Sequence, residues 1–273
     1  MKLSFATLGC PGWSLEQIAA NAKEFGFDGV ELRGIAGEHI GPEESAGERT
    51  RIRALFASAG VEICCITGYS TFTRDDPEER EQNIRVAIQL IDLAQDVGCP
   101  RLRVFGGKLS PQVDWEGNLS RVVAGLKPVT EHAARAGVQI VLETHDGWLS
   151  GEKVMAVVNS VGSESLGVCW DIANSYFVEP IEKTFAAIRG HISHVHFKDA
   201  ARVNQTEKSK LPGQGEVEME KALRLLDGCG YKEYLSFEWE KKWEPTLEEP
   251  EEAFPYYMKF CTELLQKVGV KRG

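Results

Sequence analysis

The chain has 273 residues, and its hydrophobic (42%) and charged (26%) fractions are ordinary for a globular protein. No linker or change of composition divides it, so we expect one domain over residues 1–273. The formal net charge of −10 argues against a nucleic-acid partner, because phosphate binding requires clustered Lys and Arg. No apolar run is long enough to span a membrane, so no membrane partner is expected. The seven cysteines form no CxxC motif and favour a reducing compartment, which predicts the cytoplasm.

Short apolar runs alternate with longer amphipathic stretches along the whole chain. Strands are predicted at residues 2–7, 29–34, 61–67, 101–106, 138–143, 166–171, 192–197 and 234–239. Helices are predicted to begin near Ser14, Pro42, Pro77, Trp115, Gly151, Pro180, Glu218 and Glu251. Eight strand–helix units of this kind predict an α/β fold, a (β/α)8 TIM barrel.

Local signals support several of these boundaries. Ser14 and Gln17 have the spacing of a capping box at the start of a helix. Several predicted helices run into a glycine, which accepts the positive φ found after a helix end. These glycines are Gly26, Gly60, Gly98 and Gly137. The long segments 68–76 and 199–215 follow the third and seventh strands, so we expect them as lids on the catalytic rim.

Four successive strands in the second half each end on, or carry near their end, a residue that binds divalent metals. These residues are Glu143, Asp171, His196 and Glu238. Each one alone has an ordinary explanation, such as a buried salt bridge or a helix cap. In a parallel barrel, however, all strand ends meet on one rim, so the four side chains should converge. The set therefore predicts a catalytic metal site.

The ligand types indicate which ion and which chemistry to expect. Three carboxylates and one imidazole suit Mn²⁺, Mg²⁺ or Co²⁺ better than a structural zinc site, with zinc left open. Two vacant positions in an octahedral field would fit a hydroxyl and a carbonyl of a sugar. The metal would stabilise an enediolate, while carboxylates move a proton at the adjacent carbon.

Further side chains are candidates for contacting the substrate. His194 lies two residues before His196 and shares its face of the strand, so it could hold substrate, meet a second carboxylate or be a core histidine. Lys198, at the strand exit, could contact substrate or its neighbour in the chain. Arg103 could bind substrate or brace Glu143. Trp13 could form an aromatic wall for a sugar, or simply anchor a loop.

Five segments together resemble the sugar phosphate isomerase/epimerase family with the xylose isomerase-like TIM barrel. They are VLETHD, CWDIANS, HVHFKDAAR, LPGQGE and LSFEWEKKW, and the resemblance extends over essentially the whole chain. It implies that Glu143, Asp171, His196 and Glu238 bind the metal and that the two glutamates form the acid/base pair. It further implies that Arg202 contacts substrate oxygens.

The sequence departs from the ketose 3-epimerases of that family at two positions. Those enzymes carry a histidine where this chain has Asn174, and a second glutamate where it has Leu149. Both differences weaken the transfer of ketose-epimerase activity, while the metal ligands are unaffected. The rim residues His145, Trp148 and Lys241 are candidates to replace them in contacting substrate.

These observations predict a metal-dependent isomerase or epimerase of a sugar, sugar phosphate or cyclitol. The alternative is a lyase or dehydratase that shares the first step and then expels a leaving group. A sugar-binding relative without catalysis is less favoured, since such a protein would be expected to lose a metal ligand. The partner is therefore a small carbohydrate, and a homo-oligomer is left open.

Overall fold

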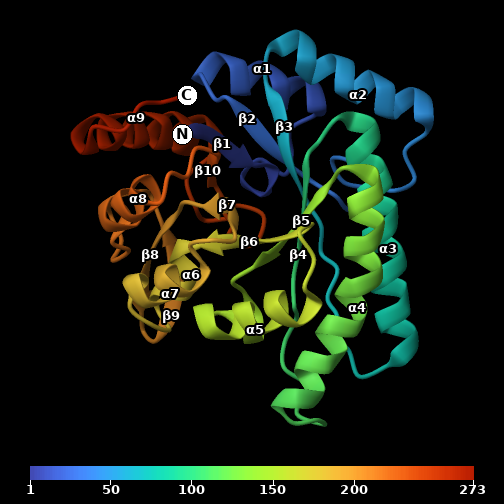
Figure 1. Cartoon of the computed structure of the whole chain (residues 1–273). Coiled ribbons are helices and arrows are strands. Elements are labelled where there is room, and N and C mark those ends of the chain that lie inside the picture. Colours follow the sequence, from blue (N-terminus) through green and yellow to red (C-terminus); the bar gives the residue numbers. More distant parts are fainter.

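The computed structural model describes residues 1–273, and its centre is a closed barrel of parallel strands (Figure 1). The barrel strands are β1 (Lys2–Ala6), β2 (Gly29–Arg33), β3 (Glu62–Thr67), β4 (Arg101–Val104), β5 (Gln139–Glu143), β6 (Leu166–Asp171), β7 (Ile192–His196) and β10 (Tyr234–Phe237). They follow one another around the barrel in chain order, and β10 closes it against β1. The predicted (β/α)8 TIM barrel is confirmed.

Helices connect the strands and pack around the outside of the barrel (Figure 1). They are α1 (Leu15–Phe25), α2 (Ala46–Ala59), α3 (Pro77–Val97), α4 (Trp115–Ala136), α5 (Gly151–Val161), α6 (Ile172–Tyr176), α7 (Ile181–Ile188), α8 (Met219–Gly228) and α9 (Pro250–Val268). The apolar faces of these helices and of the strands form one core of 65 buried residues. Burial on both faces explains why the strands read as continuous apolar runs.

The predicted helix boundaries hold where a local capping signal supported them. Ser14 and Gln17 form the capping box of α1. Gly26, Gly60, Gly98 and Gly137 each follow a helix with a positive φ, between 68° and 80°. At α2 the predicted start near Pro42 is wrong, because Ser45 accepts the Glu48 N–H and begins the helix three residues later.

Besides two short 3-10 turns, one helix and two strands were not predicted. The short helix α6 directly follows β6, and a hairpin of β8 (Asp199–Val203) and β9 (Thr206–Lys210) occupies most of the 199–215 segment. The hairpin lies beside the barrel near α6 and α7 (Figure 1). Its second strand, TEKSK, is polar and largely exposed, so it lacks the apolar pattern that identified the barrel strands.

The register of the sheet brings the predicted metal ligands to one end of the barrel. Asp171 on β6 pairs with His196 on β7, and Ser236, two residues before Glu238, pairs with His196 from the other side. Glu143, the last residue of β5, pairs with Cys169, two residues before Asp171. The four candidate ligands therefore share the carboxyl-terminal rim.

The two ends of the chain meet at the start of β1, at the end of the barrel away from the carboxyl-terminal rim. The Met1 carbonyl accepts the Gly273 N–H, and the Met1 amino group donates to the Lys271 carbonyl. Both ends lie near α9 (Figure 1). No helix of the structure combines the length and the apolar character needed to cross a membrane.

Candidate metal centre

Four side chains from four strands converge at the rim of the barrel. The Nδ1 atom of His196 lies 3.5 Å from Glu143 Oε1, 3.7 Å from Asp171 Oδ2 and 3.4 Å from Glu238 Oε2. One ligand atom from each of the four residues lies within 4.8 Å of all the others, and all four residues are buried. The structure thus brings together the residues that the sequence predicted to converge.

Local structure fixes how Asp171 presents its carboxylate. Asp171 ends β6 and is also the N-cap of α6, where its Oδ1 accepts the Asn174 N–H at 2.9 Å. The Thr144 hydroxyl accepts the Asp171 N–H at 2.9 Å, which ties β5 to β6 at the rim. One carboxylate oxygen of Asp171 therefore caps the helix while the other, Oδ2, points into the cluster.

The polar atoms of the cluster are incompletely satisfied by the protein. His196 Nδ1 is buried and has no hydrogen-bond partner, while the buried Glu143 Oε2 and Asp171 Oδ2 are ion-paired with Arg103 and Lys198 without forming a hydrogen bond of good geometry. Within reach of one another are four carboxylates, counting Glu31 below the rim, and only two permanent cations, Arg103 and Lys198. With His196 neutral, this leaves a formal excess of two negative charges among these groups, and a proton on His196 reduces it to one. The donor set therefore suits a divalent cation, since buried charge must be paired.

Arg103 lies on the Glu143 side of the cluster. Its Nε is 3.0 Å from Glu143 Oε2, its Nη2 is 3.9 Å from Glu238 Oε1, and its Nη1 donates to the Gly68 carbonyl at 2.8 Å. The guanidinium packs on the Phe105 ring, 3.9 Å from its centroid. Of the two roles considered for Arg103, these contacts favour bracing Glu143.

Lys198 lies on the other side of the cluster. Its Nζ is 3.0 Å from Asp171 Oδ2, 2.6 Å from Glu238 Oε2 and 2.7 Å from Glu240 Oε1. Burial disfavours the ammonium, but these carboxylates outweigh it and raise the pKa of Lys198 well above its usual value. Lys198 is therefore a fixed positive charge against two of the candidate ligands.

The cluster also controls the protonation of its own members. Burial disfavours a charged Glu238, but His196 and Lys198 outweigh it and lower the pKa of this carboxyl well below its usual value. Burial likewise opposes a charged His196, while Cys169, Glu238 and Glu31 raise its pKa well above 6.5. Without a metal, His196 is thus the proton-bearing cation of the cluster, and an ion that binds Nδ1 must replace that proton.

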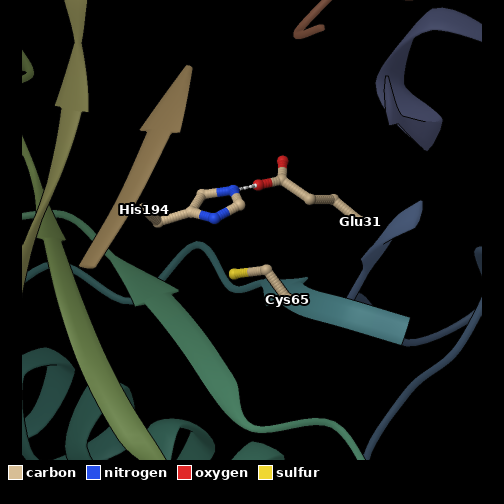
Figure 2. A group of neighbouring side chains, drawn as sticks. All are labelled: Glu31, Cys65 and His194. Carbon is tan, nitrogen blue, oxygen red and sulfur yellow. Dashed lines mark hydrogen bonds and ion pairs between the residues drawn. The ribbon is translucent and has the colours of Figure 1, made fainter. Parts of the chain in front are cut away.

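Below the rim lies a second polar layer that the sequence analysis did not identify. Glu31 on β2 is completely buried and contacts the Nε2 atoms of both His194 and His196. Figure 2 shows Glu31 and His194 facing each other across the barrel, with Cys65 beside them. A signal for Glu31 was present, since Glu31 and Arg33 alternate in the apolar strand GVELR and so share one face. His194 is in this layer and does not reach the rim.

The other predicted contact residues lie outside the cluster. Arg202 is on the exposed hairpin and bonds the Phe177 carbonyl and Glu207. His145 contacts Asp146 at 3.2 Å and packs on Phe105. Trp13 packs edge-on against Phe5 and Phe254, as a loop anchor would.

The two positions that differ from the ketose 3-epimerases, and the residues expected to replace them, also have definite places. Asn174 Nδ2 lies 3.5 Å from Glu143 Oε1, so this residue borders the cluster, whereas Leu149 ends a short 3-10 turn. Trp148 is fully buried and donates to the Gly107 carbonyl, and Lys241 bonds the carbonyls of the loop before α9. The structure therefore brings neither Trp148 nor Lys241 to the cluster.

Asp199 organises the loop that contains LPGQGE. Its Oδ2 accepts the N–H groups of Gly213 and Gly215 at 2.8 and 2.9 Å, and its Oδ1 accepts that of Val217 at 3.1 Å. A Cβ on Gly215 would lie 2.2 Å from the Asp199 carboxylate, which explains the glycine there. Asp199 is thus committed to the loop.

A polar cavity of about 660 Å³ opens at the rim beyond Glu143. It lies between the 68–76 segment, the loop after β4 and the turn after β5, and its charged lining includes Arg74, Lys108 and Asp146. Asp146 adopts a positive φ of 52°, an uncommon conformation for a residue other than glycine. Of the turn after β5 only Asp146 lines this cavity, and none of the four candidate metal ligands does.

A family model described as xylose isomerase-like TIM barrel matches residues 19–264. Fructoselysine 3-epimerase of Shigella flexneri is 24% identical over 253 residues, 87% of this chain and 90% of that enzyme. L-ribulose-5-phosphate 3-epimerase UlaE of Salmonella heidelberg is 28% identical over 239 residues, 84% of this chain and 82% of that enzyme. A 3-dehydroshikimate dehydratase of Pseudomonas putida is 26% identical over 249 residues, 87% of this chain but 38% of that longer protein.

Solved structures share the same architecture over nearly the whole chain. The IOLI protein with a bound zinc atom gives a TM-score of 0.82 at 17% identity, covering 98% of this chain and 99% of that one. An L-ribulose 3-epimerase gives 0.82 at 18% identity, covering 98% and 95%. At these identities the likeness shows the fold.

Proposed function

This chain belongs to the xylose isomerase-like TIM barrel family, and from that premise we propose that it is a sugar isomerase or epimerase that depends on a divalent metal ion. The sugar epimerases among its relatives support this class of substrate, free or phosphorylated. The observation that carries the proposal is the convergence of Glu143 and Glu238, with Asp171 and His196 between them, in a buried cluster with excess negative charge.

Glu143, Asp171, His196 and Glu238 would hold the ion, which we expect to be Mn²⁺, Mg²⁺ or Co²⁺, with zinc as the alternative that the IOLI structure suggests. When bound, the ion supplies Lewis acidity that makes a C–H next to a carbonyl more acidic. Asp171 has one oxygen free for this role because the other caps α6.

We assign the proton transfer to the two glutamates. His196 and Lys198 keep Glu238 ionised, which is the form in which a carboxyl group can act as a general base toward a sugar carbon. Arg103 contacts both Glu143 and Glu238, so it keeps the two groups in a fixed relation. An epimerase requires a proton acceptor on one face of the carbon and a donor on the other, and these glutamates are our candidates for the pair.

A dehydratase is the second candidate, favoured by Lys198. Its ammonium, 2.6 Å from Glu238, would stabilise the negative charge on a departing hydroxyl, which would leave as water with the proton that Glu238 has removed from carbon. The 3-dehydroshikimate dehydratase among the relatives supports this alternative. The first step and the residues that perform it are the same in both proposals.

Proton NMR in D₂O distinguishes the two reactions. The Mn²⁺-treated protein, freed of excess ion, would be incubated with L-ribulose 5-phosphate and with fructoselysine, the substrates named for its relatives. An epimerase incorporates deuterium at the reacting carbon without eliminating water, whereas a dehydratase yields an unsaturated product. If these and related ketoses showed no deuterium incorporation and gave no product, the proposed class would be contradicted.

A matched pair of variants tests the residue assignment. In Glu238→Gln the rate of deuterium incorporation should fall by at least about a hundredfold, as expected for removal of a general base. Glu240→Gln, which also removes a carboxylate beside Lys198 but at a more exposed position, should keep most of the activity. Full turnover by Glu238→Gln would exclude the acid/base role.

A further inference from the structure

The inner polar layer contacts the candidate metal centre through one residue, His196. Its Nδ1 faces the rim carboxylates, while its Nε2 lies 3.2 Å from Glu31 Oε2 and 3.3 Å from Oε1. His194 also directs its Nε2 at Glu31, as Figure 2 shows. Glu31, His194 and His196 are all completely buried, so water cannot substitute for any of these contacts.

The direction of these hydrogen bonds follows from the chemistry of the groups. An ionised carboxylate only accepts hydrogen bonds, so each imidazole must present an N–H to Glu31 through Nε2. Once a bound ion has replaced the Nδ1 proton, a ring that keeps its other proton on Nε2 offers its lone pair on Nδ1. In His196 this is the atom that lies among Glu143, Asp171 and Glu238. The contact below the rim thus selects which nitrogen is available above it.

We propose that Glu31 is a positioning residue of the metal centre, which holds His196 as the Nε2–H tautomer and makes Nδ1 the metal-binding atom. This inference rests on the proposed metal-dependent function. Metal-binding histidines ordinarily donate their second N–H to a carboxylate or carbonyl, which fixes the ring and raises its basicity. His194, which lies in the same layer as Glu31 and donates to the same carboxylate, holds Glu31 in the orientation that serves His196.

A second metal site among Glu31, Cys65 and His194 is the competing explanation, because their possible ligand atoms also lie within 4.8 Å of one another. The contacts favour the positioning role. His194 already uses Nε2 against Glu31, and the Cys65 thiol donates to the Ile66 carbonyl. Burial also raises the pKa of the Cys65 thiol well above 9.0, which disfavours a thiolate ligand.

Metal affinity measured by competition with a chromophoric chelator tests the proposal without any substrate. Glu31→Gln should weaken the binding of Zn²⁺ and Co²⁺ by about ten- to a hundredfold, the usual effect of removing such a partner. Cys65→Ala, a change in the same buried layer that leaves Glu31 and both histidines in place, should alter the affinity less than about threefold. Circular dichroism would verify that both variants are folded.

The tautomer can be observed directly in the unmodified protein. In the Zn²⁺-loaded chain, long-range ¹H–¹⁵N correlation spectra should show His196 with a metal-bound Nδ1 and a protonated Nε2. This measurement decides the question even if Glu31→Gln fails to fold.

Each outcome bears on a different claim. The role of Glu31 would be overturned if the metal were bound through His196 Nε2, or if folded Glu31→Gln kept the metal affinity of the unmodified protein. Neither result would contradict the metal-dependent function itself. A second equivalent of zinc that Cys65→Ala abolishes would establish the competing site. If the unmodified protein bound no divalent ion at all, the proposed metal-dependent function would fail together with this inference.

Discussion

Lys198 lies where its charge would compete with a bound metal ion. Its ammonium lies against Asp171 and Glu238, both candidate ligands, and so compensates charge that a metal would otherwise compensate. Two cations that share the same carboxylates repel one another, and in a buried site that repulsion is weakly screened. The protein without metal therefore depends on Lys198 more than the protein with metal does.

Replacing Lys198 with Met should accordingly tighten metal binding. The change keeps an unbranched side chain but removes the competing charge, and we expect the Kd for Mn²⁺ to fall by about tenfold or more. Isothermal titration calorimetry measures this, with Lys242→Met, a lysine paired with Glu38 instead, as the control. Weaker binding by the Lys198 variant would mean that its ammonium supports the ion instead of competing with it.

For single residues, the sequence predicts the four candidate metal ligands better than it predicts the residues that contact them. Glu143, Asp171, His196 and Glu238 are recognisable because each stands near the end of an apolar strand run. Glu31 stands in the middle of its strand, and the residue that it contacts is 165 positions away, so no local pattern pairs them. Its contacts depend on how far the strands are staggered around the barrel, which a single sequence does not reveal.

Among the elements, the loop after the hairpin depends on a single carboxylate. Asp199 accepts N–H groups from Gly213, Gly215 and Val217, so its removal leaves several partly buried donors without an acceptor. We expect Asp199→Ala to lower the free energy of unfolding by about 2–3 kcal/mol. Hydrogen exchange should quicken at residues 211–217.

Chemical denaturation and exchange mass spectrometry measure the two effects. Asp227→Ala provides the control, because that carboxylate lies 3.6 Å from the exposed Lys232 and accepts no comparable set of backbone groups. Unchanged exchange in the Asp199 variant would show that the turn is held by its glycines and proline alone.

At the start of helix α5, a carboxylate from another part of the chain accepts a backbone N–H. Glu179 accepts the Gly151 N–H and the Thr184 hydroxyl, each at 2.8 Å, and pairs with Lys183. Burial disfavours its charge, but these partners outweigh burial and lower the pKa of Glu179 below 4.5. A carboxyl with a lowered pKa stabilises the fold above its unfolded-state pKa and loses that contribution as pH falls through the folded-state value.

Glu179→Gln should therefore lower the free energy of unfolding by about 1 kcal/mol at pH 7. The difference from the unmodified protein should shrink as the pH falls below about 4.5. Urea unfolding at several pH values measures this. Glu152→Gln, an exposed acid in the first turn of α5, is the control. A difference that does not change with pH would exclude ionisation as the cause.

The predicted strands share a run of apolar residues that has a physical cause. The hairpin β8–β9 and helix α6, which were not predicted, lack such a run. Barrel strands are buried on both faces and are therefore mostly apolar, which makes them recognisable in the sequence. The hairpin β8–β9 is polar, and α6 has only five residues, so neither presents a periodicity to detect. The start of α2 was misplaced because Pro42 is a weaker determinant than the Ser45 cap.

For the whole molecule, closure of the barrel is what turns four distant residues into one site. Each candidate ligand is at or just beyond the end of its strand, and parallel strands bring those ends to a common rim. The repeated strand–helix order in the sequence was sufficient to predict this convergence. The substrate is harder to predict, because the loops that follow the barrel strands are arranged by packing between loops, which a single sequence does not reveal.

Calorimetric titration of the metal-free protein with Mn²⁺, compared with Asp171→Asn, tests the central claim most directly. This substitution keeps the shape of the side chain and an oxygen to cap α6, but removes the negative charge from the cluster. We predict one ion per chain for the unmodified protein and binding at least about a hundredfold weaker in the variant. No binding by the unmodified protein, or equal affinity in the two, would contradict a metal centre built from Glu143, Asp171, His196 and Glu238.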